Sequence, residues 1–415
     1  MAIHCPDNLT NAQPHKLNME SRLVEFRDKM AADLDRTMEF WLKNSHDDKY
    51  GGFFTCLTRD GKVYDETKYC WLQGRQVWTY SRLYNDVKRF HKPEILDAAR
   101  NGGEFLMKYV KNPETWKCYF SLTRDGKPLK IQRTIFSECF YLMALSELAR
   151  ATGDPKYKTE ALKMMDKILY WVRVDDTELG RPKLAGMESV NKMAIPMVIL
   201  CLIDQLVTME PGLLDKYRSD MKWCISQVLS HVQRDGKVVL ENVSFDGKEL
   251  PGCAGRLMNP GHAIEAGWVL TTLANRLEDN TLKSIAIEKF IDTSFENGWD
   301  KKYGGIFYFL DADGLSPAQL EWNMKLWWPH NEALIAFLMA YKETKNSEYF
   351  QKFSKVFDYA YKHFVDDVHG EWFGYLDRRG EINMDFKGGD YKGCFHVARY
   401  LMMCEKMATE LLGNE

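Results

Sequence analysis

The sequence YGGFFTCLTRDGKV, at residues 50–63, contains the pattern that decides the fold. Aromatic and β-branched residues precede an aspartate–glycine pair, which is a strong local signal for a β-hairpin. Neighbouring copies are about 66 residues apart except for one interval of about twice that length, which predicts six repeats with a degenerate copy near residue 180. The other copies are KCYFSLTRDGKP (117–128), the degenerate TELGRPKLAGMES, GKVVLENVSFDGKE (236–249), YGGIFYFLDADG (303–314) and GEWFGYLDRRGE (370–381).

Two stretches with helical periodicity follow each hairpin. After the second hairpin, FSECFYLMALSELARA (136–151) is apolar nearly all round, whereas DPKYKTEALKMMDKILYWVRV opens with an aspartate–proline pair and carries its charges on one face. The same order follows the fifth hairpin, with PHNEALIAFLMAYKETK and then SEYFQKFSKVFDYAYKHF. An apolar helix is typical of a buried inner position and an amphipathic helix of an outer one. Each repeat is therefore predicted to be a hairpin, an inner helix and an outer helix.

Six such repeats predict an all-α fold, an (α/α)6 barrel with short β-hairpins at the pocket end. An open solenoid of helical pairs is the alternative, but its concave face would expose the apolar inner helices to water. Because each repeat is one supersecondary unit, no domain boundary is expected. We therefore predict a single domain over residues 1–415, with a flexible N-terminal tail over about 1–18.

Composition excludes several classes of protein. Hydrophobic residues make up 45% and charged residues 28%, and the net charge of −3 comes without basic runs, so neither nucleic acid nor an anionic membrane surface is expected as a partner. No signal peptide and no membrane-spanning run is visible, which predicts a cytoplasmic protein. The ten cysteines have no CxxC pair or regular spacing and are expected to be reduced thiols.

The junctions between hairpins and inner helices should converge at one end of the barrel, around one pocket. They read WLQGRQVW (71–78), QRTIFSECF (132–140), ESVNKMAIPM (188–197), NPGHAIEAGW (259–268), LWWPHNEAL (326–334) and KGCFHVARY (392–400). Several tryptophans crowd this end, and the Trp327–Trp328 pair before Pro329, with Trp328 as the candidate, suits stacking on a sugar ring better than core filling. The polar candidates are Arg75, Glu138, Asn191, His262, Glu265, His330, Glu332, His396 and Arg399.

Three of the ten histidines lie at these junctions: His262, His330 and His396. Any one of them alone would be interpreted as a histidine that is hydrogen-bonded to nearby backbone. Because histidines recur at equivalent junctions, a catalytic role is favoured instead. His262 and Glu265 are three residues apart on one helix face, where a carboxylate can orient an imidazole. HExxH is absent, and no metal is expected.

In order and spacing, the motifs WLQGRQVW, NPGHAIEAGW, WWPHNEAL and GCFHVAR resemble the N-acyl-D-glucosamine 2-epimerase family, whose animal form is also called renin-binding protein. The resemblance covers roughly residues 20–410. It implies an (α/α)6 barrel that interconverts N-acetylglucosamine and N-acetylmannosamine, in amino-sugar and sialic acid metabolism. It also implies a homodimer, ATP as an activator that is not consumed, and renin as a further partner.

By the same resemblance, His262 and His396 match the acid/base pair, and Arg75 matches a substrate-binding arginine. His330 and Glu332 match a motif that lines the pocket, and Cys394 matches a cysteine associated with activity. The thiol of Cys394 has the simpler interpretation of a small buried group. Related epimerases and isomerases of this fold carry another histidine where Met193 aligns, and its absence favours the acylglucosamine branch.

The chemistry explains the need for two histidines. The C2 proton becomes acidic only after ring opening exposes the aldehyde, and one imidazole then removes it while the other protonates the opposite face. Arg75 is the candidate that stabilises the enolate oxygen.

Two other functions remain open at this point. An inverting glycoside hydrolase needs paired carboxylates, which Glu138, Glu265 and Glu332 could supply. A protein-binding module would need a leucine zipper, but the heptad positions from Leu184 fall on Asn191, Val198 and Gln205, and Pro196 interrupts them.

Overall fold

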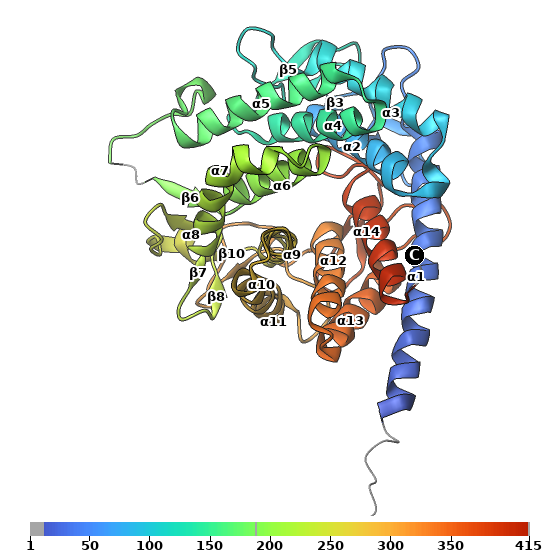
Figure 1. Cartoon of the computed structure of the whole chain (residues 1–415), viewed down its shortest axis with the longest axis vertical. Coiled ribbons are helices and arrows are strands. Elements are labelled where there is room, and N and C mark those ends of the chain that lie inside the picture. Colours follow the sequence, from blue (N-terminus) through green and yellow to red (C-terminus); the bar gives the residue numbers. More distant parts are fainter. Residues whose placement is uncertain (1–11, 187–188, 414–415) are drawn as a thin grey trace, which may run out of the picture.

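The computed structural model describes residues 12–186 and 189–413. Six helices form an inner ring in which each contacts its neighbours, and the last contacts the first (Figure 1). The ring is therefore closed, which confirms the predicted (α/α)6 barrel and excludes the open solenoid. In ring order the inner helices are α2 (Cys70–Asp86), α4 (Phe136–Thr152), α6 (Ala194–Met209), α9 (Pro260–Leu277), α12 (Trp327–Thr344) and α14 (His396–Leu411).

A second set of helices covers the ring from outside. The first of them, α1 (Ala12–Asn44), packs against the last inner helix, α14, so the chain begins with the outer helix of its final repeat. This helix starts inside the stretch expected as a flexible tail, while residues 1–11 lie outside the described part of the chain. The remaining outer segments are α3 (Pro93–Phe105) with η2 (Leu106–Val110), α5 (Pro155–Arg173), α7 (Leu213–Leu229), α10 (Asn280–Ile285) with η4 (Ala286–Thr293) and α11 (Ser294–Gly298), and α13 (Ser347–His363).

The inner and outer helices differ in burial as their sequences predict. In α12 every residue from Trp327 to Ala340 is buried. In α13 the buried residues, among them Phe350, Phe353 and Phe357, recur at three- and four-residue steps and leave a charged face outside. No helix in the described part of the chain is long and apolar enough to cross a membrane.

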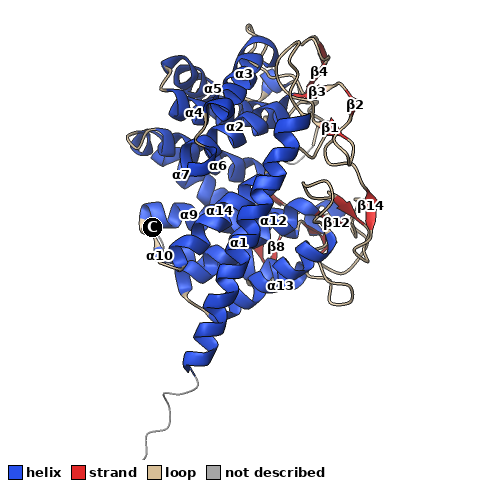
Figure 2. Cartoon of the chain, turned by 90° about the vertical axis from the view of Figure 1, so that its right-hand side faces the viewer, coloured by secondary structure: helices blue, strands red, loops and turns tan. Residues whose placement is uncertain are grey.

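Short strands and their loops gather at one end of the ring, as Figure 2 shows. The described residues form four antiparallel hairpins, each closed by a tight turn. They are β1 (Cys56–Leu57) with β2 (Val63–Asp65), β4 (Ser121–Leu122) with β5 (Pro128–Lys130), β7 (Val232–Gln233) with β8 (Val238–Val239), and β13 (Tyr375–Leu376) with β14 (Ile382–Met384). The predicted hairpins near 50–63, 117–128 and 370–381 are thereby confirmed.

The strands that precede inner helices link one repeat to the next. Strand β3 (Lys68–Tyr69) pairs with β4, and β12 (Lys325–Leu326) pairs with β13. The fourth predicted hairpin, 236–249, is divided between β8 and β9 (Asn242–Ser244). Strand β9 pairs with β6 (Val190–Lys192), from the preceding repeat.

Two of the predicted hairpins are wrong. At 303–314, β11 (Leu310–Asp311) pairs with β10 (Leu257–Met258) of the preceding repeat, because Pro317 and the loop around it supply no return strand. Near 180 the described residues form a short 3-10 helix, η3 (Thr177–Leu179), and no strand. That segment has a proline and no alternation of strand-forming residues, so the glycine and proline content alone was a misleading signal. Residues 187–188 of this segment lie outside the described part.

Candidate active site

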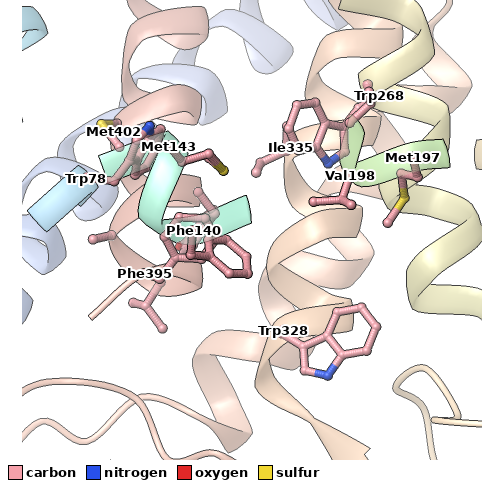
Figure 3. Close-up of a cluster of buried hydrophobic side chains, with 14 of the residues drawn as sticks. Trp78, Phe140, Met143, Met197, Val198, Trp268, Trp328, Ile335, Phe395 and Met402 are labelled. Carbon is pink, nitrogen blue, oxygen red and sulfur yellow. The ribbon is translucent and has the colours of Figure 1, made fainter. Parts of the chain in front are cut away.

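Trp328 lies close to both His262 and His396 at the hairpin end of the barrel. Its ring centroid is 5.1 Å from that of His262 and 5.9 Å from that of His396. The three residues come from α9, α12 and α14, so closure of the ring is what brings them together. Figure 3 shows Trp328 and Trp268 on one side of the barrel interior, and Phe140 and Phe395 on the other.

The opening of α9 fixes the position of His262. Asn259 is the N-cap, and its Oδ1 accepts the backbone N–H of His262 at 3.2 Å, while Pro260 occupies the first turn. Gly261 allows the close approach of α12, because a Cβ there would lie 2.7 Å from the Trp328 ring. The Asn-Pro-Gly-His sequence is thus a helix cap that also sets His262 against Trp328.

His262 has a carboxylate partner that does not belong to any inner helix. Its Nδ1 lies 2.9 Å from Oε1 of Glu241, in the segment between β8 and β9. Burial lowers the pKa of His262, but the carboxylates of Glu241, Glu265 and Glu332 outweigh it and raise the pKa above its ordinary value. The His262 side chain is 28% exposed, so its desolvation is incomplete.

His396 has the opposite electrostatic surroundings. Its Nδ1 lies 2.8 Å from Oε1 of Glu332, but its side chain is only 9% exposed. Burial and the nearby guanidinium groups of Arg75 and Arg399 hold the pKa of His396 well below its ordinary value. His262 therefore keeps its proton to higher pH than an ordinary histidine, whereas His396 loses its proton at lower pH.

Glu332 is the centre of the polar network on the α12 side. Its Oε1 accepts from Arg399 Nη2 at 2.7 Å in addition to His396, and its Oε2 accepts from Trp268 Nε1 at 2.8 Å. The same Arg399 nitrogen donates to Glu265 Oε1 at 2.8 Å. Glu265 and Arg399 therefore orient Glu332, and Glu332 orients the His396 ring.

Arg75 is held by aromatic rings. Its guanidinium carbon lies 4.7, 4.2 and 4.9 Å from the ring centroids of Trp71, Phe140 and Phe395. Among the described residues it has no ion-pair partner, and its buried Nε has no hydrogen-bond acceptor. Burial and the charge of Arg399 lower the pKa of Arg75 to about 9, which still leaves it charged at neutral pH. An unpaired, desolvated guanidinium of this kind is suited to an anionic or developing oxyanion ligand.

Two predicted site residues, His330 and Glu138, lie outside the group around Trp328 and make other contacts. His330 is fully buried, its Nε2 accepts the N–H of Ile306 at 3.0 Å, and its Nδ1–H donates to the Leu326 carbonyl at 2.6 Å. Glu138 accepts the N–H of Cys118 at 2.7 Å and pairs with Lys117 at 2.6 Å. Neither joins the group around Trp328.

The recurrence of these side chains has a structural cause. Gln73 on α2 accepts the N–H of Phe53 at 2.8 Å, just as Glu138 and His330 accept those of Cys118 and Ile306. In all three repeats the bound residue closes a tight turn through an isolated β-bridge. Recurrence at equivalent junctions was thus a sound signal for a repeated position but not, at this position, for catalysis.

Asn191 and Cys394 also lie apart from the histidines' polar network. Asn191, on β6, donates to the carbonyl of Gln227 at 3.1 Å and so ties β6 to α7. The Cys394 side chain is buried, and burial raises the pKa of its thiol well above the ordinary value. Met193 is buried immediately before α6.

The carboxylates that a glycoside hydrolase would need are already engaged. Glu138 is bound to Lys117, and Glu265 and Glu332 share Arg399. A zipper surface is likewise missing from the described part of the chain, since Val198 and Gln205 are buried inside the barrel and Asn191 belongs to a strand. The geometry favours acid–base chemistry by the two histidines over both alternatives.

The sequence interpretation missed Glu241 and Trp268. Trp268 is buried, and its indole N–H donates to Glu332. For Glu241 there was a modest signal: it is an acidic residue directly after the apolar VVL run (238–240) of the predicted hairpin at 236–249. An acidic residue beside such a run requires a partner, although the sequence does not say which one.

Comparison with known proteins gives consistent results at three levels. A sequence model of the family described as N-acylglucosamine 2-epimerase (GlcNAc 2-epimerase) matches residues 52–399. The chain is 54% identical to the N-acylglucosamine 2-epimerase of Mus musculus over 391 residues, covering 94% of this chain and 93% of the relative. It is 51% identical to that of Homo sapiens over 410 residues, covering 98% and 96%. The solved structure of cellobiose 2-epimerase from Spirochaeta thermophila is similar in fold, with a TM-score of 0.78 at 22% identity over 97% of this chain and all of that one.

Proposed function

The chain belongs to the N-acylglucosamine 2-epimerase family and is an isomerase, and we propose that it interconverts N-acetyl-D-glucosamine and N-acetyl-D-mannosamine with two histidines as acid and base. These sugars differ only in configuration at C2. The proton on C2 is weakly acidic in the closed ring and more acidic beside the aldehyde of the open chain. Ring opening therefore precedes the proton transfers.

In the proposed step His396 removes the C2 proton when it faces α14, and the electron pair of the C–H bond moves into the C1–C2 bond as C1–O1 becomes an enolate. His262 then delivers a proton to the other face of C2, and the carbonyl at C1 re-forms. The reverse reaction exchanges the two roles.

The observation that carries the proposal is that His262 and His396 both lie against Trp328, with ring centroids 5.1 and 5.9 Å from its own, and have pKa shifts in opposite directions. One protonated and one neutral imidazole is the combination from which a two-base epimerase starts. The Trp328 ring offers an apolar surface against which a sugar chain can lie between them. Arg75 supplies a fixed positive charge, and we assign it to the O1 oxygen of the enolate.

The decisive experiment is proton NMR of N-acetylglucosamine incubated with the protein in D2O. We expect anomeric signals of N-acetylmannosamine to appear, with deuterium at C2 of the product. His262→Asn and His396→Asn should each lose at least about 100-fold in epimerisation, in line with removal of a general acid or base. His330→Gln is the matched control, because this buried histidine binds only backbone groups and should keep near-normal turnover.

Single histidine variants also separate the roles. A variant that keeps only one histidine should still exchange the C2 proton of the epimer whose proton faces that histidine, while net epimerisation stops. Near-normal epimerisation by either asparagine variant would overturn the two-histidine proposal. Hydrolysis of a glycoside without epimerisation would overturn the substrate class.

ATP activation is a further expectation from the family, and the glycine-rich GGDYKG stretch (388–393) does not fit a phosphate site. Lys387 and Lys392, which flank or lie in it, are buried and paired with Asp366 at 2.9 Å and Glu371 at 2.8 Å. No step of the proposed mechanism depends on a nucleotide. Titration calorimetry with ATP tests the expectation directly.

The homodimer, the role in sialic acid metabolism and renin binding stay predictions from the family, and the cytoplasmic location stays a prediction from the sequence. Light scattering of the purified protein tests the dimer, and co-elution with renin tests that partner. Neither result changes the assignment of the histidines.

A further inference from the structure

Glu241 stands apart from the other polar groups near the histidines, because it comes from a hairpin segment and not from an inner helix. Its backbone is anchored on two sides: its N–H donates to the Leu257 carbonyl at 2.8 Å, and its carbonyl accepts from the Met193 N–H at 3.1 Å. The carboxylate is therefore presented to His262 by two neighbouring repeats. Its Oε1 lies 2.9 Å from His262 Nδ1, and its side chain is only 13% exposed.

A second group competes for the same nitrogen. Asn259 Nδ2 lies 3.1 Å from His262 Nδ1, and an amide N–H there can only donate to a bare nitrogen. A carboxylate instead requires a proton on Nδ1. The charge-assisted bond to Glu241 is the stronger of the two, so the proton stays on Nδ1 and Nε2 is left to exchange protons with a ligand.

Glu241 also differs from the other carboxylates in how much of its charge is neutralised. Glu265 and Glu332 each share Arg399, and Glu332 also binds His396. Among the described residues Glu241 pairs with no lysine or arginine, and its buried Oε2 has no hydrogen-bond partner. Its negative charge is therefore available in full to His262.

Resting on the two-histidine function proposed above, we infer that Glu241 is the positioning residue of His262: it fixes the Nδ1–H tautomer and keeps the single catalytic proton of the resting site on His262, not on His396. The remaining charged groups around the pair are Glu265 on α9, Glu332 on α12, Arg399 on α14 and Arg75 on α2. None of these four groups contacts His262 Nδ1, whereas Glu241 does.

If Glu241 holds the proton on His262, its charge affects the pH profile of kcat/KM. A merely structural role of Glu241 would not change that profile. Catalysis in either direction needs the pair to hold one proton, and the equilibrium between two uncharged sugars does not depend on pH. Both directions must therefore share one bell-shaped profile of kcat/KM, whose alkaline limb marks loss of the proton from the His262 side. The raised pKa of His262 extends that limb upward.

The test is Glu241→Gln, which keeps the shape of the side chain and removes its charge. We expect the alkaline limb of kcat/KM to move down by about one pH unit in both directions, since an opposite charge at this distance contributes about 1–3 pKa units. Glu241→Asp should restore part of the shift. Glu249→Gln is the matched control from the same hairpin, because Glu249 pairs with Arg234 on the surface, and its profile should coincide with wild type.

A second measurement separates failure of this inference from failure of the proposed function. Proteins labelled at the histidine Cε1 carbon allow the His262 signal, assigned with His262→Asn, to be titrated without any substrate. A lower His262 pKa in Glu241→Gln supports the inference even if the epimerase assay is negative. A His262 titration or an alkaline limb unchanged by Glu241→Gln would overturn it, as would a uniform loss of activity at every pH.

Discussion

Arg59, in the first repeat, and Asp366, in the last, form a two-point ion pair that joins the two ends of the ring. Arg59 Nε and Nη2 lie 2.8 and 3.0 Å from the two carboxylate oxygens of Asp366, which Lys387 also approaches at 2.9 Å. Asp366 thus binds a lysine of its own repeat and an arginine of the next repeat around the ring. The same arrangement occurs at two other aspartates, and each of these ion-pair groups joins two neighbouring repeats. The equivalent groups are Asp47 with Lys68 and Arg124, and Asp300 with Lys325 and Arg378.

Asp366→Asn is expected to destabilise the protein far more than Arg59→Met. Lys387 is fully buried, and without Asp366 its charge has no counter-ion, which costs about 3–5 kcal/mol. Arg59 is 40% exposed, and its loss should cost about 1 kcal/mol or less. Urea unfolding followed by circular dichroism measures both. Equal losses in the two variants would show that the arginine, and not the buried lysine, limits stability.

The repeat architecture could be predicted from the sequence because its signals are local. An aspartate–glycine turn, a run apolar on all sides and an amphipathic run are each read within about 20 residues. The 303–314 segment was mispredicted because its strand partner, β10, belongs to another repeat. Strand pairing between repeats joins segments that are far apart in the sequence, so the spacing of local motifs does not predict it.

The site was predictable to the same degree. His262, Trp328, His396 and Arg75 follow from the convergence of the junctions, which is a property of the ring. Glu241 does not, because its place depends on contacts with Leu257 and Met193 from neighbouring segments. The interpretation of His330 failed for a different reason. At one helix position in these repeats the side chain accepts a backbone N–H from the preceding turn, and glutamine, glutamate and histidine each occupy this position in one repeat.

His330→Gln should make the protein more resistant to acid. Burial lowers the pKa of His330 to about 3, so the unfolded chain binds a proton near pH 6.5 that the folded protein refuses. Stability is therefore lost as the pH falls from about 6.5 toward 3, by about 1.4 kcal/mol per pH unit for this group. Glutamine can accept the Ile306 N–H as Gln73 accepts that of Phe53, without titrating.

The measurement for this variant is the difference in unfolding free energy from wild type at pH 7.5, 5.5 and 4.5. We expect a small difference at pH 7.5 and a growing advantage for the variant at the lower values. A difference that does not change with pH would show that His330 takes up its proton in the folded protein.

Gly261→Ala should reduce both activity and stability. The added Cβ would lie 2.7 Å from the Trp328 ring and 3.0 Å from Pro329, so the tryptophan that packs against both histidines has to move. Overpacking of this kind costs about 1–3 kcal/mol, and a displaced ring should lower kcat/KM by about 10- to 100-fold. Gly212→Ala is the control, because a Cβ there meets no atom within 4 Å. Similar activity in both alanine variants would mean that the Trp328 position is unimportant for turnover.

Cys394→Ala should retain catalysis with an unchanged pH profile, although the family resemblance associates this cysteine with activity. Burial keeps the thiol protonated, so it is neither a nucleophile nor a base at neutral pH. Its backbone carbonyl accepts the Thr79 hydroxyl at 2.8 Å, and that contact survives the substitution. We therefore expect a loss of stability of about 1 kcal/mol from the smaller side chain and less than about 10-fold loss in kcat. The exposed Cys253 should react with a thiol reagent in the native protein while activity is maintained. A large fall in kcat for Cys394→Ala at unchanged stability would instead assign the thiol a direct part in the reaction.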